Sequence, residues 1–338
     1  MTTRPRLTPA IASVRSAVRL HIANHAASGN EESPILVGLS GGPDSLALAA
    51  ATAFEATRAG VRAGVVIIDH GLQPGSADVA ARAADQARSL GLDPVIVRAV
   101  LVGAAGGPEA AARHARYAAL VTAAAEIGAG RVFLGHTLDD QAETVLLGLA
   151  RGSGASSLKG MESVSGLYCR PLLGLRRTVT ESFCRDSQLQ PWHDPQNLDE
   201  RFTRVRVRQS VLPMLERELG PGIAEALART ATNVREDSEA LDQFAEDQLE
   251  ELAEHAEAGI SLPVRALAAN PAALRQRIIR ATVEAEFGVG LSRAQTIEVA
   301  RLVTNWHGQK RVDLPGVKVE RLGGLLVFSS TRDPIREA

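Results

Sequence analysis

Residues 35–50 read ILVGLSGGPDSLALAA, and this stretch decides the fold. The run up to Ser40 is apolar and has the length of a buried strand, and the Ala- and Leu-rich run after the turn has the composition of a helix. Between them, Gly41 and Gly42 permit a sharp turn because glycine adopts positive φ angles without steric cost. Pro43 suits the first turn of a helix, where its missing N–H is not needed. The stretch therefore predicts a strand, a glycine turn and a helix in succession.

Short apolar runs then alternate with longer, Ala-rich amphipathic stretches. Strands are predicted at 35–39, 65–68, 95–99 and 132–134, and helices at 45–59, 78–90 and 108–127. Such alternation produces right-handed crossovers and a parallel sheet with helices on both faces, so the predicted class is α/β. In these sheets the ligand binds beyond the carboxyl ends of the strands, near Ser40, Asp69 and Gly135.

The second half of the chain has a different composition. A Gly/Ser-rich loop is predicted at 151–166, and an arginine- and proline-rich region follows it. Near the end, RVDLPGVKVERLGGLLVF alternates around Gly323-Gly324, which predicts small antiparallel strands. A chain of 338 residues commonly forms two domains. We expect an α/β domain at 1–217 and, at 218–338, a smaller, mainly helical domain with a short antiparallel β element.

The charge of the chain is unevenly distributed. The 37 basic and 39 acidic residues give a net charge of −2, which taken alone argues against a partner that is a polyanion. However, residues 222–259 contain eleven acids and two arginines, so this segment carries −9 and the rest carries +7. The acidic segment is predicted to form one or two solvent-exposed helices. The basic remainder leaves nucleic acid open as a partner.

Cysteine usage and hydropathy indicate a reducing compartment. Cys169 and Cys184 form no CxxC pair, so neither a disulfide framework nor a zinc site is expected. The sequence contains no apolar run of about 18 residues, and its N-terminus has no secretory signal. Apolar residues recur at helical spacing between 11 and 22, which predicts a first helix packed on the core. We expect a cytoplasmic protein that does not contact a membrane.

The glycine turn also predicts a phosphate site. Free N–H groups in the turn and at the helix N-terminus bind anions. The Asp44 carboxylate and bound phosphates would repel each other unless Mg²⁺ bridged them, so this residue also predicts a Mg²⁺ ion. The sequence has neither a Walker-type GxxxxGKS/T motif nor a GxGxxG motif after a strand. The alternative is an ordinary turn in which Asp44 and Ser45 cap the helix.

Residues 40–45, SGGPDS, resemble the SGGxDS signature of the PP-loop ATP pyrophosphatases, which split ATP into AMP and pyrophosphate to activate a carbonyl-type oxygen. Three further blocks resemble motifs of one PP-loop family, the tRNA(Ile)-lysidine synthetases. The blocks are Asp69-His70-Gly71-Leu72 for its (D/H)HGL motif, Glu109, Arg113, Arg116 and Tyr117 for its ExxxRxxRY helix, and 134–144, LGHTLDDQAET, for its GHxxDDQAET stretch. From spacing alone, the arginine helix could equally be a solvated, salt-bridged face, and the two acids a favoured helix start.

The resemblance continues downstream of these blocks. Residues 170–173, RPLL, followed by Arg176, resemble the family's RPLL segment with its trailing arginine. Residues 191–213 resemble its W-x-x-DPSN, R-x-R-x-R and LP region, with Gln196 in place of Ser and Val205 in place of Asn. The likeness covers 33–215 and, more weakly, 262–328, which looks like the family's small appended domain without the further C-terminal domain of longer members.

The resemblance implies two steps on one transfer RNA. The C2 carbonyl oxygen of the wobble cytidine in the CAU anticodon of tRNA(Ile) attacks the α-phosphorus of ATP, and free L-lysine then displaces AMP to give lysidine. ATP binding is implied for Ser40, Gly41, Gly42, Pro43, Asp44, Ser45, Asp69, His70, Gly135 and His136. Catalytic roles are implied for Asp44, His136, Asp139, Asp140 and Arg113, with Mg²⁺ on Asp44 and Asp140. Lysine or tRNA contacts are implied for Arg113, Arg116, Glu143, Arg204, Arg206 and Arg208.

Several alternatives stay open at this stage. Arg201, Arg204, Arg206 and Arg208 could face RNA phosphates or could alternate along a solvated strand. A related PP-loop tRNA thiolase would need paired cysteines, and an NAD or GMP synthetase would need a different second half. A non-catalytic RNA-binding relative would not need the intact set of acids. A homodimer is possible.

Overall fold

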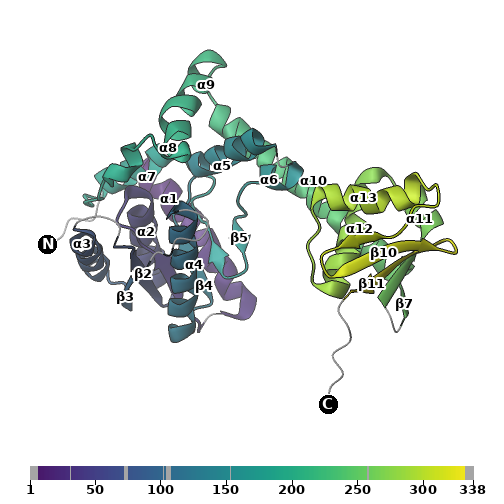
Figure 1. The fold of residues 1–338 in the computed structure, drawn as a ribbon. Helices are drawn as coiled ribbons and strands as arrows, with labels where there is room; N and C mark the ends of the chain where they lie inside the picture. Colours follow the sequence, from purple (N-terminus) through teal and green to yellow (C-terminus); the bar gives the residue numbers. More distant parts are fainter. Residues whose placement is uncertain are drawn as a thin grey trace. The chain divides into compact units, whose positions relative to one another are not determined.

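The computed structural model describes residues 7–30, 32–71, 75–101, 103, 108–152, 154–256 and 259–331. The chain divides into two compact units, Met1–Thr232 and Asn233–Ala338. The division falls inside the long helix α10 (Ile223–Leu252), so each unit is described by itself (Figure 1). The sequence instead places a domain boundary at 217–218, at the end of α9 (Leu212–Glu218), and this boundary stays a prediction.

A six-stranded sheet organises the described part of the first unit. Its strand order is β3-β2-β1-β4-β6-β5. Its strands are β1 (Ile35–Gly38), β2 (Ala63–Asp69), β3 (Val95–Ala99), β4 (Arg131–Leu134), β5 (Val164–Ser165) and β6 (Tyr168–Cys169). Neighbouring pairs are parallel except the short β5–β6 pair. The predicted parallel sheet is confirmed, and its first four strands match the predicted runs to within two residues.

Helices cover both faces of this sheet, as predicted. The longer ones are α1 (Pro9–His25), α2 (Pro43–Ala59), α3 (Ser76–Ser89), α4 (Pro108–Ile127), α5 (Leu138–Arg151) and α7 (Arg177–Asp186). Alternate residues of β1 explain the two layers: Ile35 and Val37 pack in one core with α1, α2, α3 and α7, and Leu36 packs in another with α4. This is the two-sided burial expected of a central parallel strand.

The arginine-rich segment differs from one expectation. Short helical elements follow α5: α6 (Ala155–Leu158), η2 (Pro195–Leu198), α8 (Thr203–Arg206), η3 (Val207–Val211) and α9 (Leu212–Glu218). The strand considered for 201–208 is therefore wrong, because α8 and η3 form one helical path through these residues. Helical geometry places Arg204 and Arg208 on one face, four residues apart, and directs Arg206 away from them.

The second unit is built on an antiparallel sheet of five described strands in the order β7-β8-β11-β10-β9. The strands are β7 (Glu254–Ala256), β8 (Gly259–Pro263), β9 (Val312–Leu314), β10 (Val317–Leu322) and β11 (Leu325–Ser330). They enclose an apolar core with α11 (Val264–Ala269), α12 (Ala272–Phe287) and α13 (Arg293–Thr304). Gly323-Gly324 forms the predicted tight turn between β10 and β11, with positive φ at both glycines. The β7–β8 pair was not predicted.

Candidate active site

The glycine turn joins β1 to α2 and presents free N–H groups. Gly41 has φ +83°, a conformation that favours glycine, and Gly42 precedes α2 without a capping side chain among the described residues. Ser45 Oγ instead accepts from Ser40 N at 3.2 Å and donates to Gly42 O at 3.0 Å, which holds the turn closed. Trp192 N also donates to Gly41 O at 2.8 Å. An uncapped helix N-terminus in a preformed turn is suited to bind an anion.

Gly135 lets the end of β4 approach this turn closely. A Cβ atom at Gly135 would lie 3.0 Å from both the N and the Cα of Ser45, a distance shorter than side chains normally tolerate. Since β2, β1 and β4 are adjacent, the residues at their carboxyl ends share one edge of the sheet. The predicted position of the site at this edge is therefore consistent with the structure.

Asp44 and Asp140 converge on one guanidinium group. Arg177 Nε lies 3.1 Å from Asp44 Oδ2, and Arg177 Nη2 lies 2.8 Å from Asp140 Oδ1. The second oxygen of each acid has a separate partner: Thr180 donates to Asp44 Oδ1, and Thr137 donates to Asp140 Oδ2 from both its N and its Oγ1 at 2.9 Å. Each carboxylate thus keeps one oxygen directed at a common point.

Burial affects these two acids differently. Burial raises the pKa of Asp44, although Arg177 and Thr180 oppose this effect. Burial also acts to raise the pKa of Asp140, but Arg177 and the Thr137 N–H outweigh it and lower the pKa. Asp140 is therefore the more firmly ionised member of the pair, and Asp44 would gain more from an additional cation.

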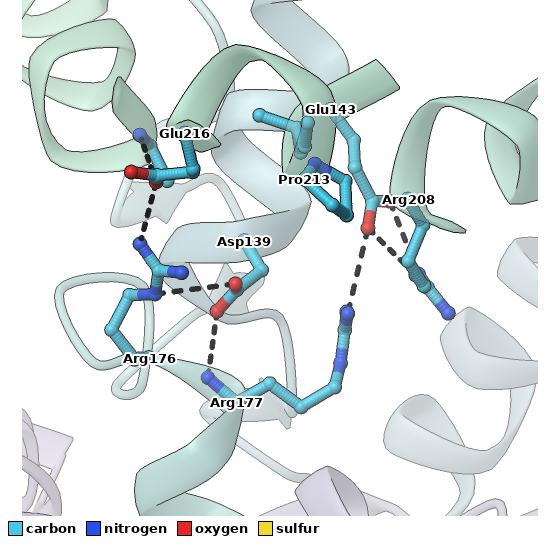
Figure 2. Close-up of a pocket in the computed structure, with 9 residues that line it drawn as sticks. Asp139, Glu143, Arg176, Arg177, Arg208, Pro213 and Glu216 are labelled. Carbon is cyan, nitrogen blue, oxygen red and sulfur yellow. Dashed lines mark hydrogen bonds and ion pairs between the residues drawn. The ribbon is translucent and has the colours of Figure 1, made fainter. Parts of the chain in front are cut away.

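Glu143 is fully buried beneath three arginines. Arg208 Nε lies 2.7 Å from its Oε1, Arg204 Nε lies 3.1 Å from its Oε2, and Arg177 Nη1 lies 3.5 Å from its Oε1. Arg208 Nη2 additionally reaches Asp140 Oδ1 at 3.2 Å. Figure 2 shows Arg177 and Arg208 meeting at Glu143. Arg204 and Arg208 therefore lie beside Glu143, which the sequence also predicts as a site residue.

Asp139 has a position of its own. Its Oδ2 accepts from the backbone N of Arg177 at 2.7 Å, at the start of α7, and its Oδ1 pairs with Arg176 Nε at 3.2 Å. Arg176 extends from there to Glu216 at 3.6 Å (Figure 2) and to Glu225 at 3.0 Å. Asp139 thus holds the N-terminus of α7, and the roles expected for it beyond that stay a prediction.

His136 is a half-buried imidazole with a lowered pKa. Burial, and then Arg170, Arg116 and Arg113, lower its pKa to about 4, although Asp140 acts in the opposite direction. Its Nδ1 has no hydrogen-bond partner among the described residues. A neutral ring surrounded by guanidinium groups can donate or accept a hydrogen bond near a phosphate, and an incoming anion would raise its pKa.

The turn after β2 and the arginine helix flank the same edge. Asp69 Oδ1 accepts from Gly71 N at 2.9 Å, and burial followed by the charge of Arg116 lowers the pKa of His70. On α4, Arg113 and Arg116 lie over the ring of Tyr117, 4.8 and 5.7 Å from its centroid. Leu72 and the side chain of Glu109 lie outside the described residues. The charges of Arg113 and Arg116 thus act on His136, and that of Arg116 also on His70, while Arg113 itself is exposed.

Arg206 is separated from this group of arginines. Its Nη1 donates to the backbone oxygens of Glu200 at 2.5 Å and Arg201 at 3.1 Å, and Arg201 itself pairs with Asp199 at 2.7 Å. Both arginines therefore brace the loop before α8. An RNA contact of Arg206 stays a prediction.

A cavity of about 210 Å³ opens beside the acid–arginine cluster. Its wall includes Asp139, Glu143, Arg176, Arg177, Arg208, Leu212, Pro213, Glu216 and Ala224, all of which are drawn in Figure 2. Glu216 also accepts from the backbone N of Gly222 at 2.7 Å, which fixes the start of α10 to this wall. The wall of the cavity therefore carries acidic and basic side chains, and a small part of it is apolar.

Both cysteines are buried and free. Burial raises the pKa of Cys169 to about 11 and that of Cys184 to about 12. Cys184 Sγ contacts Pro43 O at 3.3 Å behind the glycine turn. Neither thiol has the ionisation that a sulfur-transfer nucleophile requires, so the chain lacks support for the thiolase alternative.

Arg177 is the central residue of this cluster that the sequence did not predict. Arg176 is the arginine predicted after the RPLL segment, yet a strict three-residue gap after Leu173 leads to Arg177. Thr180 was missed as well, and a lone threonine in a helix gives no signal of its role. The structure brings together Asp44, Asp140 and Glu143 from α2 and α5, but the arginine between them comes from more than 130 residues after Asp44.

Comparisons with known proteins agree with this geometry. A PP-loop domain family matches residues 14–215, and the TilS substrate binding domain matches residues 262–326. The chain is 63% identical to a tRNA(Ile)-lysidine synthase of Leifsonia xyli subsp. xyli, over 87% of this chain and 89% of the relative. It is 50% identical to a tRNA(Ile)-lysidine synthase of Thermobifida fusca, over 92% of this chain and 94% of the relative.

A solved structure supports the fold independently. The U34-tRNA thiolase NcsA from Methanococcus maripaludis superposes with a TM-score of 0.55 over 67% of this chain and 80% of that chain, at 16% identity. This likeness concerns the fold alone. Within the described ranges, no helix is both long and apolar enough to cross a membrane. Given the relatives at 50 to 63% identity and the match to both domains, the chain belongs to the tRNA(Ile)-lysidine synthase family.

Proposed function

We propose that this chain uses ATP to join L-lysine to C2 of the wobble cytidine in the CAU anticodon of tRNA(Ile), giving lysidine, AMP and pyrophosphate. The observation that carries the proposal is the acid–arginine cluster of Asp44, Asp140 and Glu143 directly beside an uncapped glycine turn. The names of its relatives support the same reaction. Since ATP, lysine and tRNA are cytoplasmic, we place the reaction there.

The turn at 40–45 is the proposed site of the ATP phosphates. Its free N–H groups and the positive end of α2 favour an anion, and the arginines around His136 add positive charge on the other side. The Asp69-His70 turn and Gly135 border the same edge of the sheet. His136 is proposed to bind an oxygen of the α-phosphate, where the anion would favour its protonated form.

Mg²⁺ fits the two acids at this site. Asp44 Oδ2 and Asp140 Oδ1 converge on a single guanidinium, so one small cation could reach both oxygens. Carboxylate oxygens are preferred Mg²⁺ ligands, and phosphates commonly complete the shell. Mg²⁺ bound here would neutralise charge on the phosphates during transfer.

Activation of the cytidine is needed before the amine can react. A carbonyl oxygen is a poor leaving group, whereas AMP leaves readily once that oxygen has attacked the α-phosphorus and pyrophosphate has departed. The amine of lysine then adds at C2, loses a proton and expels AMP. A carboxylate near the amine can accept that proton.

The cavity beside the cluster is the proposed lysine site. Its wall carries both signs of charge, as a zwitterionic amino acid with a cationic side chain requires. Glu143 lines the cavity and also belongs to the cluster around Asp140, so we assign it to the incoming amine. Arg113, Arg116, Arg204 and Arg208 are the proposed contacts for the anticodon phosphates near this site.

The test is incorporation of labelled lysine. The purified chain is incubated with ATP, Mg²⁺ and labelled lysine, together with transcripts of tRNA(Ile) or tRNA(Met) that both carry a CAU anticodon. Label is expected in tRNA(Ile) alone, with one AMP released for each lysine attached. Label in neither transcript contradicts the proposal.

A pair of variants locates the activity in the cluster. Asp44→Asn should lower the rate of lysine attachment by roughly 10²-fold, because the site loses one of its two metal-facing charges. The matched control is Asp85→Asn, a change at an exposed aspartate on α3 that pairs only with nearby Arg88 among the described residues. Equal activities of the two variants would remove Asp44 from the mechanism.

A further inference from the structure

Arg177 has an unusual number of acidic partners for a single side chain. Its three guanidinium nitrogens contact three different carboxylates: Nε faces Asp44 at 3.1 Å, Nη2 faces Asp140 at 2.8 Å, and Nη1 faces Glu143 at 3.5 Å. The side chain is 18% exposed, so these contacts are only weakly screened by water. Arg177 thus connects α7 to both acid-bearing helices.

The contacts of Arg177 overlap with those of the proposed metal. Thr180 occupies the second oxygen of Asp44, and Thr137 occupies the second oxygen of Asp140. The remaining oxygens, Asp44 Oδ2 and Asp140 Oδ1, both contact Arg177, and Arg208 Nη2 also lies 3.2 Å from Asp140 Oδ1. A cation on these two oxygens and the guanidinium of Arg177 would therefore compete for the same atoms and would repel each other.

The surroundings allow the side chain of Arg177 to leave while its backbone stays in place. The backbone N of Arg177 donates to Asp139 Oδ2 at 2.7 Å, which fixes the start of α7. The cavity of about 210 Å³ is lined by both Arg177 and Glu143 and therefore offers space next to the guanidinium group. A rotation of the side chain into this space would move its charge away from the two acids.

We propose that Arg177 is the internal counter-ion of the metal site, which positions Asp44 and Asp140 before ATP arrives and is displaced by Mg²⁺. The inference rests on the metal site proposed above and assigns to that site a built-in competitor. In the metal-free state Arg177 keeps two nearby carboxylates from repelling each other. After displacement its charge remains beside Glu143, at the wall of the cavity. Arg177 is on this account a positioning residue.

Metal binding without ATP, lysine or RNA tests the inference. Mn²⁺ serves as a paramagnetic probe for Mg²⁺, and its affinity for the full chain is measured by electron paramagnetic resonance. Arg177→Gln removes the competitor and should tighten Mn²⁺ binding by about ten-fold, which corresponds to about 1.4 kcal/mol. A purely structural role predicts the opposite, because a loosened site binds metal more weakly.

The neighbouring arginine provides a matched control. Arg176→Gln removes the same charge one residue earlier, but the described partners of Arg176 are Asp139, Glu216 and Glu225. Its Mn²⁺ affinity should equal that of the parent chain. Adding Asp44→Asn to Arg177→Gln should abolish the gain, which shows that the gained affinity belongs to this site. Unchanged or weaker Mn²⁺ binding in folded Arg177→Gln overturns the inference.

Two further results separate this inference from the proposed function. If Asp44→Asn has no effect on Mn²⁺ binding in either background, the metal site itself is wrong, and the inference fails with it. If Asp44-dependent binding is present but Arg177→Gln gives no gain, only the competition fails. Should Arg177→Gln not fold, a crystal structure of the parent chain with Mg²⁺ and a non-hydrolysable ATP analogue decides. Arg177 must then have left both acids, and retained contacts beside a bound metal overturn the inference.

Discussion

Arg177 illustrates what the sequence could and could not reveal at the scale of single residues. The residues of the glycine turn and of the 134–144 block were found because each group is contiguous and has a recognisable spacing. Arg177 contacts Asp44 across more than 130 residues, and no local pattern encodes that contact. Only the fold brings α2, α5 and α7 together. Residues that act through long-range contacts therefore require the structure.

His136 leads to a prediction about pH. Its pKa of about 4 in the folded chain lies below the 6.5 of a free imidazole, so the unfolded chain takes up a proton first as the pH falls. The free energy of unfolding should therefore decrease between about pH 6.5 and pH 4, by roughly 3 kcal/mol in total from this group. Urea unfolding of the parent chain and of His136→Gln across this pH range measures the effect. The variant has no imidazole at this position, so its free energy of unfolding should not show this decrease.

The exposed His114 supplies the control for that experiment. His114→Gln makes the same change at an exposed position on α4 and shows how far the loss of any histidine alters the curve. If the stability difference between parent and His136→Gln were the same at pH 7 and pH 4, His136 would not be held neutral by its surroundings.

At the scale of elements, the sequence predicts the strands with a regular apolar pattern well and the shortest elements poorly. The strands β1 to β4 are apolar runs bounded by glycine or helix starts, and the sequence shows them. β5 and β6 are two residues each and leave no periodic signal. Arg204, Arg206 and Arg208 recur every second residue, which suggests a strand. Arg204 and Arg208 nevertheless both pair with Glu143, and helical spacing is what places these two residues on one face. Tertiary ion pairs here override a local pattern.

The packing of α1 on α2 gives a second prediction. Glu55 is 3% exposed and pairs with Arg15 at 2.7 Å and Arg19 at 2.8 Å. Replacing both arginines by alanine leaves a buried carboxylate without its partners and should therefore lower the free energy of unfolding. Glu55→Gln should cost less, because no buried charge remains. Thermal and urea unfolding measure both.

An exposed ion pair provides the control for this prediction. Arg88 pairs with Asp85 at 2.8 Å on the surface of α3, and Arg88→Ala should change the stability by no more than about 0.5 kcal/mol. If the double variant at Arg15 and Arg19 were as stable as Arg88→Ala, α1 would not depend on the buried pair.

For the whole molecule, the distribution of charge matters more than its sum. Residues 222–259, which include α10, carry the excess of negative charge. The arginines around His136 and Glu143 belong to the basic remainder. The segment charges could be counted from the sequence, but the division of the chain inside α10 could not, because a continuous helix gives no boundary signal.

This distribution predicts a strong effect of salt on tRNA binding. About six phosphate contacts should reduce the association constant by roughly 10³-fold between about 50 and 200 mM salt, because bound counterions are released. Arg113→Gln should make the slope of log K against log salt shallower by about one, because one phosphate contact is lost. Filter binding at several salt concentrations measures both, and an affinity independent of salt would contradict the assignment of the arginines.

The central claim is that the glycine turn activates the cytidine before lysine reacts. The most direct measurement supplies Mg²⁺, tRNA(Ile) and ATP labelled at the α-phosphate, with lysine left out, and follows the label on a rapid-quench time scale. The account predicts a burst of labelled AMP attached to the RNA, with pyrophosphate released in equal amount, and its discharge as free AMP once lysine is added. Label that joins lysine instead of RNA, or pyrophosphate release that requires lysine but no tRNA, would contradict it.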